Sequence, residues 1–157
     1  MNTPETISVR VRGASKTKVL INGEDDKAIF LNLSDTGILD RLNETYHKMS
    51  AEAQKAVAFK AEDFDFENPD DEKMQETLAK LNEYDASLRG MINYVFDSEV
   101  AEACSAGGKM YDPVDGLFRY EVIMEDLFTL YGETLPAEFE KILKKREERT
   151  KKYTKKK

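Results

Sequence analysis

The spacing of apolar residues changes once along this chain, and that change constrains the fold more than any other feature. In the first third, apolar residues recur at every second position, the period of a half-buried strand. From about residue 39 onward they recur three and four residues apart, the period of an amphipathic helix. The sequence therefore predicts an α+β protein, in which a small N-terminal antiparallel sheet packs on a bundle of about four helices.

The strands are predicted between residues 7 and 33. In the stretch 7–12, Ile, Val and Val alternate with Ser, Arg and Arg. The β-rich run 19–21 then meets Asn22-Gly23, a pair that tolerates positive φ and favours a tight hairpin turn. A return strand follows over 29–33. These runs predict a hairpin or a three-stranded sheet, which is too small to be stable without helices on one face.

The first two long helices carry clear apolar stripes. Ser34 or Asp35 is expected to cap the first, and Asn68 followed by Pro69 to start the second. Asp85 occupies the one position where the second stripe lacks an apolar residue, unless its neighbour Tyr84 takes that place. The stripes are Leu39, Leu42, Tyr46, Met49, Ala53 and Ala56 in the first helix, and Met74, Leu78, Leu81, Leu88, Ile92 and Val95 in the second.

Three further helices are predicted after the first two. A turn or two of helix is expected over 98–105, ending before Gly107-Gly108. Asp112-Pro113 is expected to open a third long helix that Gly132 terminates, and Pro136 to start the last one. The third stripe is Leu117, Tyr120, Met124, Leu127 and Tyr131, and the last helix is anchored only by Phe139, Ile142 and Leu143.

Charge divides the chain into a body and a tail. Residues 144–157 hold nine of the 24 Lys and Arg residues and two of the 31 Asp and Glu residues, a net charge of +7 against −14 for residues 1–143. We therefore predict one α+β domain over 1–143 and a basic C-terminal tail over 144–157. The acidic body would repel phosphate, so it is a poor nucleic-acid surface. Opposite charges on arm and body would also allow copies to associate head to tail.

Composition favours a cytoplasmic protein without a membrane segment. No apolar run approaches the roughly 20 residues needed to cross a bilayer. The first residues lack both the basic and the apolar region of a secretory signal. Cys104 is the only cysteine, which excludes an internal disulfide framework and fits a reducing compartment.

No catalytic set, metal site or cofactor site emerges from the motifs. A calcium loop read from Asp63 would have Asn68 where the turn needs Gly and Met74 where the closing Glu belongs. His47 is the only histidine, which is too few for a histidine zinc site. Cys104 lies among small residues and is expected to be a packed thiol. The sequence thus predicts a protein that is not an enzyme. Asp85 and Cys104 remain as weak candidates for a catalytic residue.

Two segments are candidates for partner binding. The acidic stretch 62–72 contains two aromatic residues, which either lie under the sheet or form an exposed contact segment. The basic tail either frays in solvent or binds a partner. The candidate residues are Phe64, Phe66, Lys144, Lys145, Arg146, Arg149, Lys151 and Lys152.

Several segments, in order, resemble small tail assembly proteins of phages and prophages of Gram-positive bacteria. The resemblance starts at Thr17 to Glu24 and the following strand 29–31, and continues through Met91 to Val100. It also includes Gly107-Gly108, the helix predicted from Leu117 to Tyr131, and the basic ending. These proteins are the tail assembly chaperones, and the likeness to them is a resemblance in segment order. The resemblance implies a non-enzymatic protein that coats the tape-measure protein and recruits tail-tube subunits in the bacterial cytoplasm.

Two other readings stay open at this stage. The first is a nucleic-acid-binding accessory protein that acts through the Lys- and Arg-rich tail, for which Tyr153 is the only ring available for stacking. The second is self-association through the oppositely charged arm and body. An enzyme is the least favoured reading.

Overall fold

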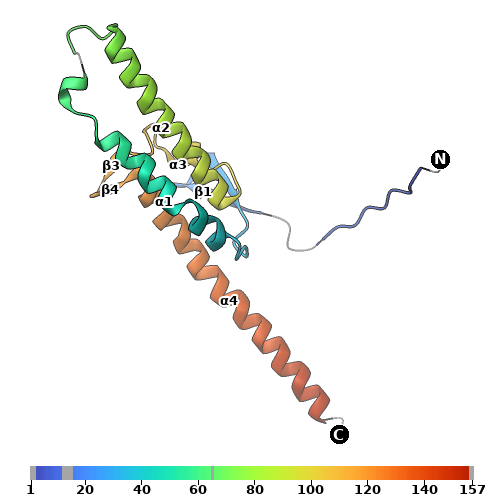
Figure 1. Cartoon of the computed structure of the whole chain (residues 1–157). Coiled ribbons are helices and arrows are strands. Elements are labelled where there is room, and N and C mark those ends of the chain that lie inside the picture. The colour runs from blue at the N-terminus through green and yellow to red at the C-terminus, as the bar shows by residue number, and fades with distance from the viewer. Residues whose placement is uncertain (1–2, 12–15, 65, 156–157) are drawn as a thin grey trace.

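The computed structural model describes residues 3–11, 16–64 and 66–155, and these form an α+β fold with two small hairpins and long helices (Figure 1). The α+β class predicted from the sequence is confirmed. The elements are β1 (Thr17–Ile21), β2 (Glu24–Leu31), α1 (Ile38–Val57), the 3-10 turn η1 (Ala61–Asp63), α2 (Glu72–Phe96), α3 (Ala101–Cys104), β3 (Pro113–Val114), β4 (Leu117–Phe118) and α4 (Arg119–Lys155).

The predicted hairpin is present, and its turn has the expected chemistry. Strands β1 and β2 pair antiparallel, with Val19 opposite Ile29, and a bulge between Leu20 and Ile21 shifts the register near the turn. Asn22 and Gly23 both have positive φ, 53° and 71°. This is the primed turn that matches the twist of two antiparallel strands.

The predicted strand over 7–12 is wrong for the residues that the structure describes. Residues 3–11 have no strand assignment and are exposed, whereas Arg12 lies outside the described residues. The sheet is therefore a two-stranded hairpin, not a three-stranded sheet. Alternation of apolar and polar residues indicates a tendency to form a strand, but a strand forms only where another strand supplies its hydrogen-bond partners.

Helices α1 and α2 form an antiparallel pair that packs along much of its length (Figure 1). The buried residues of α1 are Ile38, Thr45, Met49 and Ala53, so only Met49 and Ala53 of the predicted stripe are buried. The helix begins after Gly37, and Asp35 serves as an acceptor for the Gly37 N–H at 2.9 Å, not as the cap itself. Helix α2 starts at Glu72, three residues after the predicted Pro69.

The structure corrects the prediction of two separate C-terminal helices. Asp112-Pro113 does not open a helix; it leads into the small β3–β4 hairpin, whose turn residues Asp115 and Gly116 have φ of 52° and 82°. Helix α4 then runs without a break from Arg119 to Lys155, with Pro136 inside it. Gly132 does not end the helix. Proline removes only one backbone hydrogen bond, and strong helix formers on both sides carry the helix past it.

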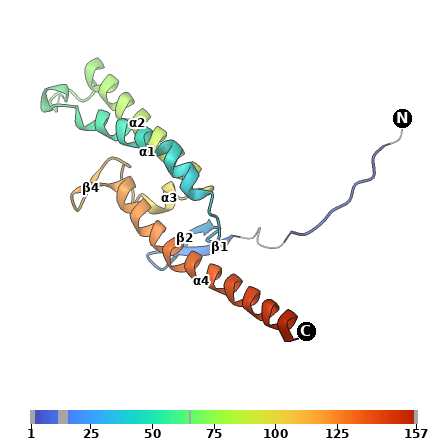
Figure 2. The ribbon, with the colours of Figure 1, turned by 60° about the horizontal axis from the view of Figure 1, so that its bottom comes forward.

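The core lies where the inner face of the β1–β2 hairpin, α1, α2, α3 and the first part of α4 meet. Its members are buried apolar side chains from all of these elements, among them Ile29, Leu31, Met49, Leu88, Ile92, Ala101 and Leu127. Beyond about residue 139, α4 projects from this core as a single exposed arm (Figures 1 and 2). In the described part of the chain, no helix is both long and apolar enough to span a bilayer.

Candidate functional site

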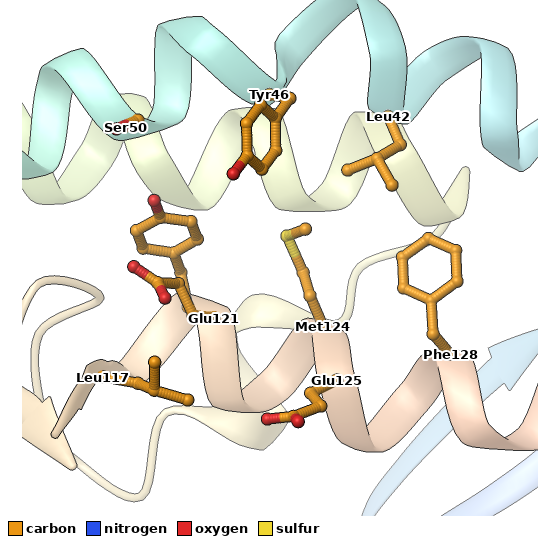
Figure 3. A pocket seen from close by; sticks show the side chains of 9 residues that line it. Leu42, Tyr46, Ser50, Leu117, Glu121, Met124, Glu125 and Phe128 are labelled. Atoms are coloured by element: carbon orange, nitrogen blue, oxygen red, sulfur yellow. The ribbon is translucent and has the colours of Figure 1, made fainter. Parts of the chain in front are cut away.

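An open groove of about 400 Å³ lies between α1 and α4. Figure 3 shows Leu42, Tyr46 and Ser50 entering from α1, opposite Met124 and Phe128 from α4. The other lining residues are Leu117, Tyr120, Glu121 and Glu125. The groove is open along one side, so an elongated segment could enter it laterally.

The walls of the groove are apolar because the apolar stripe of α4 is wider than the part of it that packs in the core. Tyr120 and Met124 are nearly buried and form its floor, whereas Phe128 is half-buried. On the opposite wall, the ring of Tyr46 is 57% exposed. Burying such a ring against a partner would remove a large apolar area from water, which favours binding.

The groove stays open because the face of α1 that packs against α2 is not the face that carries Tyr46. Thr45 is buried, and its hydroxyl donates to the carbonyl of Arg41 at 2.9 Å. Tyr46, the next residue, then points away from α2 toward α4 (Figure 3). An apolar face that its own chain leaves uncovered is typical of a contact surface.

The rim of the groove is acidic. Glu121 and Glu125 are carried on α4 one turn apart, with Glu125 exposed. Burial raises the pKa of the Tyr120 hydroxyl to about 12, with smaller contributions from Glu121 and Tyr46. That hydroxyl is therefore protonated at neutral pH. The site combines an apolar floor with carboxylates at its edge, which suits a helix carrying apolar side chains flanked by Lys or Arg.

The aromatic candidates from the acidic stretch lie elsewhere. Phe64 and Phe66 occupy the connection between α1 and α2, at the end of the helical pair that is distant from the C-terminus (Figure 1). Phe64 is half-buried, with ring centroids 6.4 Å from Phe59 and 6.2 Å from Phe66. Phe66 is 81% exposed. The expectation that both rings lie under the sheet is wrong, because the nearest rings belong to the α1–α2 connection and α2.

The basic candidates all lie on the projecting part of α4. Their side chains are exposed, and Lys144 pairs with Glu140 at 3.3 Å, one helical turn away. The residues are Lys144, Lys145, Arg146, Arg149, Lys151 and Lys152. The structure therefore separates the predicted aromatic and basic candidates, which lie at opposite ends of the molecule (Figure 1).

Apolar side chains accompany the basic ones on this arm. Phe139, Ile142 and Leu143 are each about half exposed or more. They continue the apolar stripe of α4 past the point where the rest of the chain covers it. The arm is therefore an amphipathic helix without a helical neighbour among the described residues.

Asp85 is a structural ion-pair partner at the centre of α2. Its buried carboxylate accepts the Met110 N–H at 2.8 Å and the Arg89 Nε–H at 2.8 Å. Arg89 also donates to the carbonyl of Gly108 at 2.8 Å and to Glu102 at 2.9 Å. These bonds fix the loop that follows α3. Asp85 thus fills the gap in the stripe itself, and its oxygens are engaged by the fold.

Cys104 is packed, as predicted. Burial, with a contribution from Asp126, raises the pKa of its thiol to about 11, which lowers the thiolate fraction needed for nucleophilic chemistry. Among the described residues, no group of three or more His, Cys, Asp or Glu side chains is arranged to hold a metal ion.

The sequence named most of the groove residues but assigned them to the core. Leu42, Tyr46 and Met124 were expected to be buried stripe positions, because periodicity alone does not separate a covered face from an open one. One signal was available. The apolar stripe of α1 begins with Ile38 and Leu39 side by side, so it is wider than one neighbouring helix can cover.

The comparisons with known proteins do not assign this chain to a family. No protein-family model matches it. Neither the curated proteins nor the solved structures give a match.

Proposed function

We propose that this protein is a non-enzymatic helix-binding chaperone that acts in phage or prophage tail assembly. The observation that carries the proposal is the open apolar groove between α1 and α4. The segment order that resembles tail assembly chaperones supports the biological setting. The tape-measure protein is the proposed client and the tail-tube subunit the proposed second partner.

An amphipathic helix fits the groove by chemistry. Such a helix presents apolar anchors three and four residues apart, and these would pack on Tyr46, Met124 and Phe128. The unbranched, polarisable side chain of Met124 can adapt to clients of different sequence. Glu121 and Glu125 would select helices that carry basic residues beside the apolar ones. The acidic body would keep a complex with an apolar client soluble.

The test uses fragments of a phage tape-measure protein, with binding measured by calorimetry. We expect a dissociation constant in the range of about 1 µM for the wild-type chain. Tyr46→Glu places a charge in the groove and should weaken binding about tenfold or more, as for a central interface aromatic. Val57→Glu is the matched control, because Val57 is an exposed apolar residue of the same helix outside the groove lining.

Two results would contradict the proposal. The first is no binding of any tape-measure fragment at concentrations of about 100 µM, well above the expected dissociation constant. The second is equal weakening by Tyr46→Glu and Val57→Glu, which would mean that binding does not use the groove. Circular dichroism of both variants establishes that the fold is retained.

Nucleic-acid binding through the arm is the second candidate, favoured by the exposed basic residues of α4 from Lys144 onward. Deleting residues 149–157 should then abolish binding to duplex DNA, and affinity should fall steeply as salt rises. Affinity that does not change with salt would exclude this candidate. The tape-measure test is independent of the deletion, so the two functions are distinguishable.

A further inference from the structure

The N-terminal segment of residues 3–11 is a strand-like sequence that lies away from the rest of the protein. Figures 1 and 2 both show it running outward from the β1–β2 hairpin. Its apolar side chains are exposed: Ile7 by 86%, Val9 by 80% and Val11 by 67%. Three β-branched residues at alternate positions and fully in water are costly for a soluble protein, and typical of a segment that another surface covers.

The backbone of this segment is also unpaired. None of the backbone hydrogen bonds between described residues involves positions 3–11. Because the segment is exposed, water satisfies its N–H and C=O groups, and these groups remain available to a neighbouring strand. The segment is therefore available as an additional strand.

The β1–β2 hairpin offers sheet edges to which such a strand could be added. Because the sheet has only two strands, each of them has one edge that no strand of the described chain pairs. Val19 and Ile29 face the core, but the outer face carries Leu20 and Phe30, which are 41% and 50% exposed. A third strand added at an edge would extend one apolar face of this sheet with its own alternate side chains.

We infer that the segment 5–11 pairs with an open edge of the β1–β2 sheet in a second copy of this chain. A segment and an edge that are both free in one molecule are both satisfied when two copies meet, by strand addition of the kind seen in peptide recognition. Ile7, Val9 and Val11 then lie on the apolar side of the extended sheet. Ser8 and Arg10 lie on the other side.

Charge favours this pairing over direct contact between two hairpins. The bulged end of each hairpin carries Glu24, Asp25 and Asp26, so two hairpins placed edge to edge would bring like charges together. The incoming segment instead carries one acid, Glu5, and one base, Arg10, so it adds no net negative charge to this end. Backbone hydrogen bonds and apolar contacts supply the affinity, and charge sets the choice of partner. The inference does not depend on the groove or on any client.

The first experiment measures the mass of the full chain in solution by light scattering at about 100 µM, a hundredfold above a micromolar dissociation constant. The wild-type chain is expected to have at least twice the 18.0 kDa mass of one chain. Val9→Asp should return it to monomer, because the charge falls on the apolar side of the strand. Ser8→Asp is the matched control, with the same added charge one residue away, and should keep the wild-type mass. Both positions are exposed, so neither change disturbs the core.

Salt separates this contact from association through the basic arm. At about 1 M salt the Debye length is about 3 Å, so contacts between the arm and an acidic surface dissociate, whereas strand pairing persists. A monomeric wild-type chain, loss of the oligomer in high salt, or equal behaviour of Val9→Asp and Ser8→Asp would each overturn the inference.

A second experiment asks whether the pairing joins two chains. Isotope-labelled and unlabelled chains are mixed, and a carbodiimide joins carboxylates to neighbouring amines. We expect links from Glu5 to Lys18 or Lys27 that connect a labelled with an unlabelled chain. Links found only within one chain, or no link between Glu5 and the hairpin, overturn the inference.

Discussion

Replacing Asp85 by Ala tests the buried ion pair that joins α2 to the loop after α3. The substitution leaves the Met110 N–H buried and unpaired, which costs about 1–3 kcal/mol. It also removes a charged acceptor from Arg89. Breaking a buried pair costs about 3–5 kcal/mol. Arg89 is 23% exposed and retains Gly108 and Glu102 as acceptors, so its share falls below that range, at about 1 kcal/mol, and the Met110 N–H contributes about 2 kcal/mol. We expect a total loss of about 3 kcal/mol.

Urea unfolding followed by circular dichroism measures this loss. With a slope of about 2 kcal/mol per molar urea, the midpoint of Asp85→Ala should fall by about 1.5 M. Glu102→Ala is the control, because it removes the other carboxylate that contacts Arg89. The Glu102 side chain is 92% exposed, so this change should cost less than about 1 kcal/mol. Hydrogen exchange at the Met110 amide should accelerate in Asp85→Ala only.

A loss below about 1 kcal/mol for Asp85→Ala, or a loss equal to that of the control, would refute this reasoning. A double-mutant cycle adds a stricter test. If the two groups act as a pair, Asp85→Ala combined with Arg89→Ala should cost less than the sum of the single changes. An additive result would mean that the 2.8 Å contact contributes no coupling energy.

Three further predictions concern other parts of the fold. Gly108→Ala should cost about 1–3 kcal/mol in urea unfolding, because its Cβ would meet Asp112 Oδ2 at 2.6 Å. Gly132→Ala, in open space within α4, should instead stabilise the fold by up to about 1 kcal/mol. Equal effects of the two substitutions would contradict the structure. Alkylation of Cys104 at neutral pH should be roughly a hundredfold slower than that of a free thiol, since its pKa is raised from 9.0 to about 11, and an ordinary rate would exclude the packed thiol. Burial raises the pKa of Tyr131 from 10.0 to about 12, so the folded state holds this proton more tightly than the unfolded state. The free energy of unfolding should therefore fall as the pH rises from 10 to 12. Tyr131→Phe should lessen that fall, and an unchanged alkaline profile would count against the prediction.

Turn chemistry was the most dependable guide to the fold, where it was recognised. Asn22-Gly23 predicted the first hairpin correctly. Asp115-Gly116 carries the same signal, a dipeptide that tolerates positive φ at both positions, but Pro113 directed the prediction toward a helix start. Pro136 misled in the same way. A proline is compatible with a helix start, a strand end and a helix interior, and neighbouring residues decide among them.

The candidate groove could be predicted only in part. Apolar periodicity identified Leu42, Tyr46 and Met124 as members of helical stripes, which the structure confirms. Their accessibility depends on how far α1 lies from α4, and that distance follows from the packing of α1 on α2. Apart from the width of the α1 stripe, local sequence carries no information on that geometry.

The sequence by itself determined the α+β class, the first hairpin and the approximate positions of α1 and α2, because periodicity and turn residues act over a few neighbouring positions. Only the tertiary structure decided that the segment with Val9 stays unpaired, that α4 continues through Pro136, and that Tyr46 faces an open groove. Each of these depends on whether a distant part of the chain supplies a hydrogen-bond partner or an apolar surface. Such pairings are set by the whole packed structure and not by local propensity.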